Sequence, residues 1–106
     1  FYRFNSETVT TVPFGTTGAE TVTVVDAITN RSIEVVSYVV VASGESEVKF
    51  LSNTTPLTSG LTLGNNGGVS STNNEGLMRT SDGEALKFVS NDADSMMGGH
   101  VSYKVV

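Results

Sequence analysis

Apolar and polar residues alternate in short runs along most of the chain, and residues typical of turns separate the runs. Within residues 20–26, Val22 and Val24 alternate with Thr21 and Thr23. The same period of two recurs at Val48 and Phe50, at Leu61 and Leu63, at Leu86 and Phe88, and at Val101, Tyr103 and Val105. A period of two places successive side chains on opposite faces of a strand. Each run therefore predicts a β-strand with one apolar and one polar face.

About eight such strands predict an all-β fold, and we expect an antiparallel β-sandwich with a jelly-roll-like topology in preference to an immunoglobulin-like one. The length of 106 residues suffices for one modest core, so residues 1–106 are expected to form a single domain. Residues 1–18, which include Pro13, predict an extended N-terminal arm with at most a short strand at 9–12. The sandwich core is then expected to span residues 19–106.

A tight turn is predicted at Asp82-Gly83, between the segments at residues 77–81 and 84–90. A two-residue type I′ turn needs positive φ at both central residues, which Gly accepts freely and Asp less easily. The pattern therefore predicts a β-hairpin in this part of the chain.

The run at residues 32–42 departs from the alternation because both of its faces are apolar. Val35, Val39 and Val41 lie on one face, and Val36, Tyr38, Val40 and Ala42 lie on the other. A sheet in a two-layer sandwich buries only one face, so the second face needs a cover. A neighbouring subunit or a loop or arm of the same chain could supply it. We predict an intermolecular contact, made by Val36, Tyr38 and Val40.

Charge and composition exclude several partners. Acidic residues outnumber basic ones by 11 to 6, and the basic residues are scattered from Arg3 to Lys104. A nucleic-acid surface needs clustered positive charge, so no nucleic-acid partner is expected. The chain has no cysteine, which removes disulfides and thiolate metal sites. No apolar run approaches the roughly 20 residues of a membrane span, so no membrane partner is expected.

The residues that could carry chemistry do not form a recognisable catalytic set. His100 is the only imidazole, and its strand position places it on a polar face without an acidic neighbour in sequence. Three acidic pairs, Glu45 with Glu47, Asp82 with Glu84 and Asp92 with Asp94, lie in or beside turns, where acidic residues are common. The chain has no Trp to line a sugar-binding cleft. We expect no enzymatic activity, no catalytic residues and no cofactor.

The run of oxygen-bearing side chains in residues 91–95 has two interpretations. It offers closely spaced ligands for calcium, but it lacks the Gly and the closing Glu of the helix-loop-helix calcium motif. A solvated loop is the alternative, and we predict no metal site.

The start of the sequence concentrates aromatic residues. Phe1, Tyr2 and Phe4 are three of the eight aromatics in the chain. Such a segment docks on a partner or aggregates, so these residues are predicted to contact a capsid or a neighbouring copy.

The order of strands and turns resembles small β-sandwich structural proteins of tailed bacteriophages, including capsid decoration, or cement, proteins. The segments that carry the resemblance are Ile33–Ala42 with Ser43-Gly44, then Val48 to Ser52, Leu61 to Gly68, Asp82 to Leu86, and Gly98 to Tyr103. The resemblance covers roughly residues 20–106 and leaves the N-terminal arm unmatched. The chain departs from the pattern in the Asn-rich stretch 65–74 and at Met96-Met97.

This resemblance implies a virion structural protein at the capsid surface. It would bind the outside of the phage head as a homotrimer, with the major capsid protein and neighbouring copies of itself as partners. Two alternatives stay open: a tail- or fibre-associated module that binds a host glycan or protein through loops such as residues 65–74, and an inert spacer within a fibre.

Overall fold

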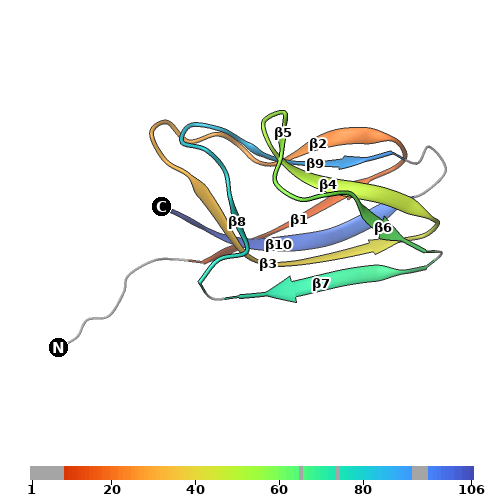
Figure 1. The fold of residues 1–106 in the computed structure, drawn as a ribbon. Coiled ribbons are helices and arrows are strands. Elements are labelled where there is room, and N and C mark those ends of the chain that lie inside the picture. The colour runs from red at the N-terminus through yellow and green to blue at the C-terminus, as the bar shows by residue number, and fades with distance from the viewer. Residues whose placement is uncertain (1–8, 65, 74, 92–95) are drawn as a thin grey trace.

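The computed structural model describes residues 9–64, 66–73, 75–91 and 96–106, and these form a sandwich of two antiparallel sheets (Figure 1). Their strands are β1 (Thr10–Thr16), β2 (Glu20–Val25), β3 (Ile33–Ala42), β4 (Ser46–Ser52), β5 (Thr55–Pro56), β6 (Leu61–Leu63), β7 (Gly68–Thr72), β8 (Met78–Arg79), β9 (Leu86–Ser90) and β10 (Met97–Val105). The predicted all-β sandwich is confirmed, with ten strands in place of about eight.

Each sheet combines strands that are distant in sequence. The first, here called the β3 sheet, has the order β1-β10-β3-β7, and β8 pairs with β3 beyond the end of β7. The second, here called the β4 sheet, has the order β2-β9-β4-β5, and β6 also pairs with β4. The chain crosses between the two sheets repeatedly, so most of its pairings join segments far apart in sequence. No helix in the described part of the chain is long and apolar enough to cross a membrane.

The core lies between the two sheets and includes many of the alternate apolar residues that the sequence predicts. Val48, Phe50, Leu86, Phe88 and Val101 are all fully buried. Their polar neighbours in the same strands remain at least partly exposed. The period-two pattern therefore predicted correctly which face of these strands points inward, because each sheet covers the apolar face of the other.

Strand β1 lies within the segment that the sequence predicts as an arm. It pairs with β10 along its whole length, from Thr10 opposite Tyr103 to Thr16 opposite Met97. Phe14 points into the core, where its ring centroid lies 4.7 Å from that of Phe88. The structure thus places residues 10–16 in the sandwich rather than in an extended arm. An edge strand tolerates Pro13 when its nitrogen faces away from the neighbouring strand, and this tolerance is why proline was a misleading signal here.

The predicted hairpin at Asp82-Gly83 is wrong. The strand before the turn, β8, pairs with β3, whereas β9 after it pairs with β2 and β4 in the other sheet. Gly83 has φ 77°, whereas Asp82 is not among the residues with positive φ. A hydrogen bond from the Glu84 N–H to the Ser81 carbonyl closes the turn at 3.1 Å. Positive φ at the third residue alone is typical of a type II turn, and this one carries the chain between sheets.

A β-bulge in β3 changes which residues of that strand face the core. The register with β10 shifts where Tyr103 pairs with Val35 and Ser102 pairs with Ser37, so Val36 has no partner in β10. An extra residue reverses the alternation. Val35 therefore joins the core-facing residues from the other half of the strand.

The bulge corrects the predicted contact residues of β3. Tyr38 (9% exposed) and Val40 (0%) belong to the core, and Val36 (7%) is also buried. In the isolated chain these three side chains are covered by the protein itself, so they do not offer a surface to a partner. The residues of β3 that point outward are instead Ser37, Val39 and Val41, because they alternate with the core residues.

Glu34, at the start of β3, is the centre of a charged cluster. Its carboxylate lies 2.8 Å from the Arg79 guanidinium and 3.4 Å from the Lys104 ammonium. Hydrogen bonding by Arg79 is the main cause that lowers the pKa of Glu34; burial opposes this effect, and the nearby charges of Arg79 and Lys104 add to it. The ion pairs therefore favour the folded state when Glu34 is ionised.

We predict that Gly83→Val destabilises the domain by about 1–3 kcal/mol, because a β-branched residue is strained at positive φ. The cost is purely conformational, since a Cβ at Gly83 would meet no atom within 4 Å. Gly64→Val is the matched control: its Cβ also meets nothing within 4 Å, and its φ lies outside the left-handed region. Thermal melting should separate the two variants, and equal melting temperatures would contradict the turn assignment.

We also predict a pH-dependent contribution from Glu34. A lowered folded pKa means that its stabilising effect is present above the unfolded value of about 4.3 and is lost as pH falls through the folded value. The free-energy difference between the wild type and Glu34→Gln should therefore shrink between about pH 6 and about pH 3 in denaturant titrations. Glu47→Gln, at an exposed carboxylate of the β4 sheet, controls for the loss of one charge. A pH-independent difference would contradict the prediction.

Candidate interaction surface

The outward face of the β3 sheet is free of charged side chains over three consecutive rows. Strand register places the following residues side by side across β1, β10, β3 and β7: Gly15, Gly98, Val41 and Gly68; then Pro13, His100, Val39 and Ser70; then Thr11, Ser102, Ser37 and Thr72. These rows are here called the uncharged face. The cluster of Glu34, Arg79 and Lys104 lies beyond the third row and bounds it.

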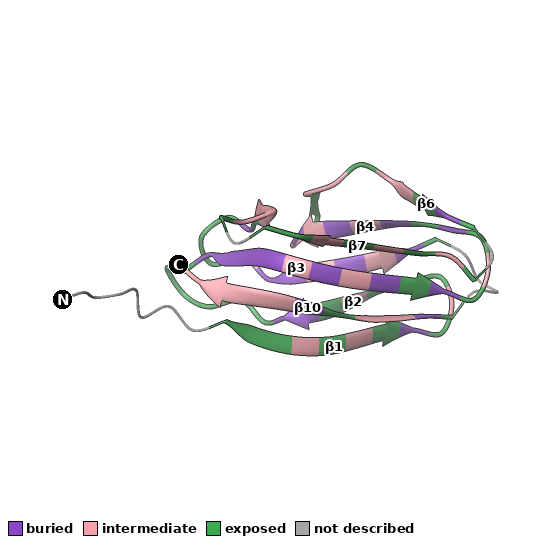
Figure 2. Cartoon of the chain, turned by 90° about the horizontal axis from the view of Figure 1, so that it is seen from below, coloured by how far each residue is buried: buried purple, intermediate pink, exposed green. Residues whose placement is uncertain are grey.

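Val41 is the most prominent apolar side chain of this face. It is 51% exposed, although β3 is buried along most of its length (Figure 2). Its neighbours in the same row are glycines on both sides, so no adjacent side chain shields it. Exposing an apolar side chain in this way costs free energy that contact with a partner would recover.

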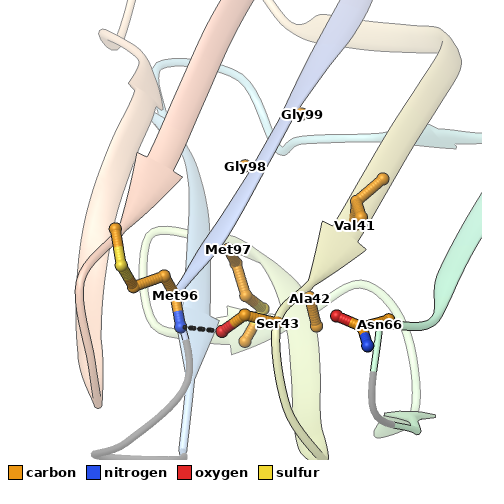
Figure 3. A pocket seen from close by; sticks show the side chains of 8 residues that line it. All are labelled: Val41, Ala42, Ser43, Asn66, Met96, Met97, Gly98 and Gly99. Atoms are coloured by element: carbon orange, nitrogen blue, oxygen red, sulfur yellow. Dashed lines mark hydrogen bonds between the residues drawn. The ribbon is translucent and has the colours of Figure 1, made fainter.

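A hollow of about 640 Å³ lies beside Val41. Its lining comprises Val41, Ala42, Ser43, Asn66, Met96, Met97, Gly98 and Gly99. Figure 3 shows Met96 and Val41 on either side of β10, with the glycine backbone between them. A smaller hollow of about 190 Å³ borders Val41 on the β7 side, next to Gly68 and Ser70. Val41 therefore stands between two depressions in the sheet surface.

The backbone of Met96 is held firmly at the rim of the larger hollow. Its N–H donates to the Ser43 hydroxyl oxygen at 2.9 Å, and its carbonyl accepts from the Ser43 N–H at 2.9 Å. The Met96 side chain itself is 60% exposed. Methionine is flexible and polarisable, so it adapts to the shape of an apolar partner.

Gly98 is not required by the fold of the chain itself. A Cβ at this position would meet nothing closer than the Phe14 carbonyl oxygen at 3.9 Å, and its φ lies outside the left-handed region. By contrast, a Cβ at Gly99 would overlap the Val39 carbonyl oxygen. Glycine inside a strand costs about 0.5–1 kcal/mol relative to alanine and often marks the close approach of another backbone or a ligand. Gly98 fits a surface that a partner approaches closely.

The outward face of the β4 sheet differs in its charge. Its outward positions alternate with the buried residues of β4 and β9 and include Glu47, Lys49 and Lys87. Charged side chains therefore occur on the outward face of the β4 sheet but not in the three rows of the uncharged face. Charged residues are depleted at the centres of protein interfaces, which favours the uncharged face as the contact surface.

The structure describes only some of the predicted site residues. Phe1, Tyr2 and Phe4 lie outside the described residues, and so do four of the five residues at 91–95. His100 is exposed within the uncharged face, between Pro13 and Val39. The described residues contain no group of three or more His, Asp or Glu side chains placed to hold a metal ion.

Sequence reasoning missed the residues that define this surface. Val41 was correctly grouped with Val39 but wrongly with Val35, because the bulge in β3 cannot be inferred from the alternation of apolar and polar residues. Gly98 was noted only as part of a segment that carries the resemblance, and Met96 only as a departure from it. The glycine pair just before the predicted strand was the available signal, but its meaning depends on which atoms surround each glycine.

Comparison with known proteins identifies the fold but no family. No protein-family model matches the sequence, and no curated protein matches it. The nucleoplasmin-like N-terminal domain of Drosophila FKBP39 is similar in structure, with a TM-score of 0.57 and 11% identity over 95% of this chain and 93% of that one.

Two phage capsid structures also contain similar chains. A chain of the cyanophage Pam1 capsid asymmetric unit has a TM-score of 0.54 and 16% identity, covering 97% of this chain and 93% of its own length. A chain of the acidic stable capsid of Helicobacter pylori bacteriophage KHP30 has a TM-score of 0.53 and 14% identity, covering 96% and 92%. At these identities the likeness shows a shared fold, and this fold occurs in phage capsids as well as in a nucleoplasmin-like domain.

We predict opposite effects from adding a carboxylate at two adjacent residues of β3. Val40→Glu would bury an unpaired charge in the core and should unfold the domain. Val41→Glu places the charge on the uncharged face and should change the free energy of unfolding by no more than about 1 kcal/mol. Circular dichroism melting curves test both variants. A folded Val40→Glu variant or an unfolded Val41→Glu variant would contradict the assigned orientation of β3.

Proposed function

We propose that this chain is a virion structural protein, a capsid decoration or cement protein that binds the outer surface of a phage head and stabilises it. Its partners in this proposal are the major capsid protein and neighbouring copies of itself in a homotrimer. The role is mechanical and involves no enzymatic activity. The observation that carries the proposal is the uncharged face, with Val41 exposed beside Gly98.

The uncharged face has the properties of an interface that is incomplete in the isolated chain. Val41 and Met96 provide apolar contact area, and the glycines beside Val41 let a partner approach the sheet backbone. His100 and the hydroxyl groups of the other rows provide hydrogen-bonding positions without fixed charge. A contact of this kind is governed by shape and burial, so salt should weaken it little.

The size of this face favours a role within an assembly. Three rows across four strands cover on the order of 300 Å² at ordinary strand spacings. Each partner in a standard stable interface contributes about 800 Å². One such face therefore binds weakly by itself, and strong attachment requires several contacts made at the same time. A multivalent protein on a repeating shell meets this requirement.

The structural comparisons support the proposal at the level of the fold. Similar chains occur in two phage capsid structures, and each is covered over more than nine-tenths of its length. The similarity to a nucleoplasmin-like domain means that the fold does not decide the function. The uncharged face is the feature that favours attachment to a shell.

The test uses heads of the phage whose genome encodes the chain, stripped of this protein and then incubated with purified variants. Wild-type protein should rebind in hundreds of copies per head and raise the temperature at which the heads rupture. Val41→Glu and Gly98→Arg should reduce the affinity at least about tenfold, which corresponds to about 1.4 kcal/mol. Both changes obstruct or charge the uncharged face.

Val89→Glu is the matched control, because it adds the same charge to the outward side of β9 in the β4 sheet. It should bind heads as the wild type does. Equal binding by Val41→Glu, Gly98→Arg and the wild type would refute attachment through the uncharged face. A few copies per particle, located on the tail, would instead favour a recognition module.

A further inference from the structure

One residue of the uncharged face can change its charge. His100 is the only residue of the three rows whose side chain takes up a proton near neutral pH. Its imidazole is exposed, and no described residue forms a hydrogen bond or an ion pair with it. Imidazole side chains ordinarily gain a proton near about pH 6.5. The face is therefore without charge only while His100 is neutral.

Strand pairing places His100 in the interior of the uncharged face. It belongs to β10, which lies between β1 and β3 in the sheet. Pro13 lies opposite it on β1, and Val39 lies opposite it on β3. Along β10, its neighbours on the same face are Gly98 and Ser102. A partner that covers the row of Gly98 and the row of Ser102 therefore also covers the imidazole.

The strands around His100 supply no carboxylate beside it. The other titratable or charged residues of β1, β10 and β3 are Glu34, Tyr38, Tyr103 and Lys104. Tyr38 belongs to the core, and Tyr103 packs against it, so neither lies on the outward face. The hollow beside this face is lined by residues without charge.

The nearest charged groups on the sheet are too distant to compensate a proton on His100. Lys104 lies four residues further along β10, which is about 13 Å at ordinary strand spacing. Glu34 pairs with Lys104 in the register and already binds both Lys104 and Arg79. The screening length at physiological ionic strength is about 8 Å. A charge on His100 would therefore stand alone in the middle of the face.

We infer that protonation of His100 releases this chain from its capsid partner, so attachment through the uncharged face is lost in mildly acidic solution. Contact with a partner removes water from the imidazole, and desolvation disfavours the charged form of a histidine. Charged residues are depleted at the centres of interfaces, so we expect no carboxylate of the partner opposite His100. The inference deepens the proposed function by naming a condition that regulates attachment, and it rests on that function.

The sign and the size of the effect follow from linkage. The partner holds the neutral form more tightly, so binding expels a proton and the affinity falls as the pH falls. For an ordinary imidazole at about pH 5, about 30 free chains are protonated for each neutral one. Complete exclusion of the protonated form would therefore weaken binding about 30-fold between about pH 8 and about pH 5. Partial exclusion gives a smaller factor.

The experiment measures binding of the full chain to stripped heads from about pH 8 to about pH 5 at constant ionic strength. The wild type should bind at least about fivefold more weakly at the lower pH. His100→Gln keeps a polar side chain that does not titrate, so its affinities at the two pH values should agree within about twofold. His100→Lys is charged throughout, so it should bind at about pH 8 as weakly as the wild type does at about pH 5.

Two further measurements separate His100 from other groups. Calorimetry near about pH 6.5, in buffers of different ionisation enthalpy, should show net proton release when the wild type binds and none when His100→Gln binds. Val89→His in the His100→Gln background moves an imidazole to the outward side of β9 in the β4 sheet. This double variant should bind heads with the same affinity at both pH values.

A wild-type affinity that stays constant or rises as the pH falls would overturn the inference and leave the attachment proposal standing. An equal loss of binding by the wild type and His100→Gln would also overturn it, because the acid would then act on another group, on the fold or on the heads. Absence of wild-type binding at every pH would overturn both the attachment proposal and this inference.

Discussion

The packing of four aromatic rings between the sheets is the interaction on which the rest of the structure depends. Phe50 and Phe88 are paired across β4 and β9, with centroids 5.3 Å apart. Phe14 of β1 and Tyr38 of β3 reach them from the opposite sheet, at 4.7 Å from Phe88 and 5.2 Å from Phe50. These contacts include the largest side chains of the core. They fix which face of each sheet points inward, and therefore which residues remain for a partner.

The bulge at Val36 allows both halves of β3 to direct apolar side chains into this core. Without the bulge, Val35 and Tyr38 would lie on opposite faces of the strand, so one of them would point outward. With it, Val35, Tyr38 and Val40 all face the core, and Val41 faces solvent. The strand whose sequence is apolar on both faces therefore consists of two halves, and the bulge between them changes which alternate residues point inward. Much less apolar surface needs an external cover than continuous alternation implied.

Two uncovered parts of the described structure differ in their chemistry. On the uncharged face, Val41 lies between two hollows, and Gly98 leaves the strand backbone open to close approach. The edge of β7 that faces away from β3 has no partner strand among the described residues. A face suits a partner of different structure, whereas an edge suits an extended segment.

The sequence by itself determined the fold class and most of the core, because the period of two is imposed by strand geometry wherever one face is buried. It also showed an acidic chain whose basic residues are scattered along the sequence. Only the tertiary structure decided that Pro13 lies within an edge strand, that Asp82-Gly83 joins two sheets, and that Val41 rather than Val40 faces outward. Each of these depends on which distant strand becomes a neighbour. The alternation of residues along one strand does not show which strands pair with it, and a one-residue bulge exchanges the inward and outward faces of the strand.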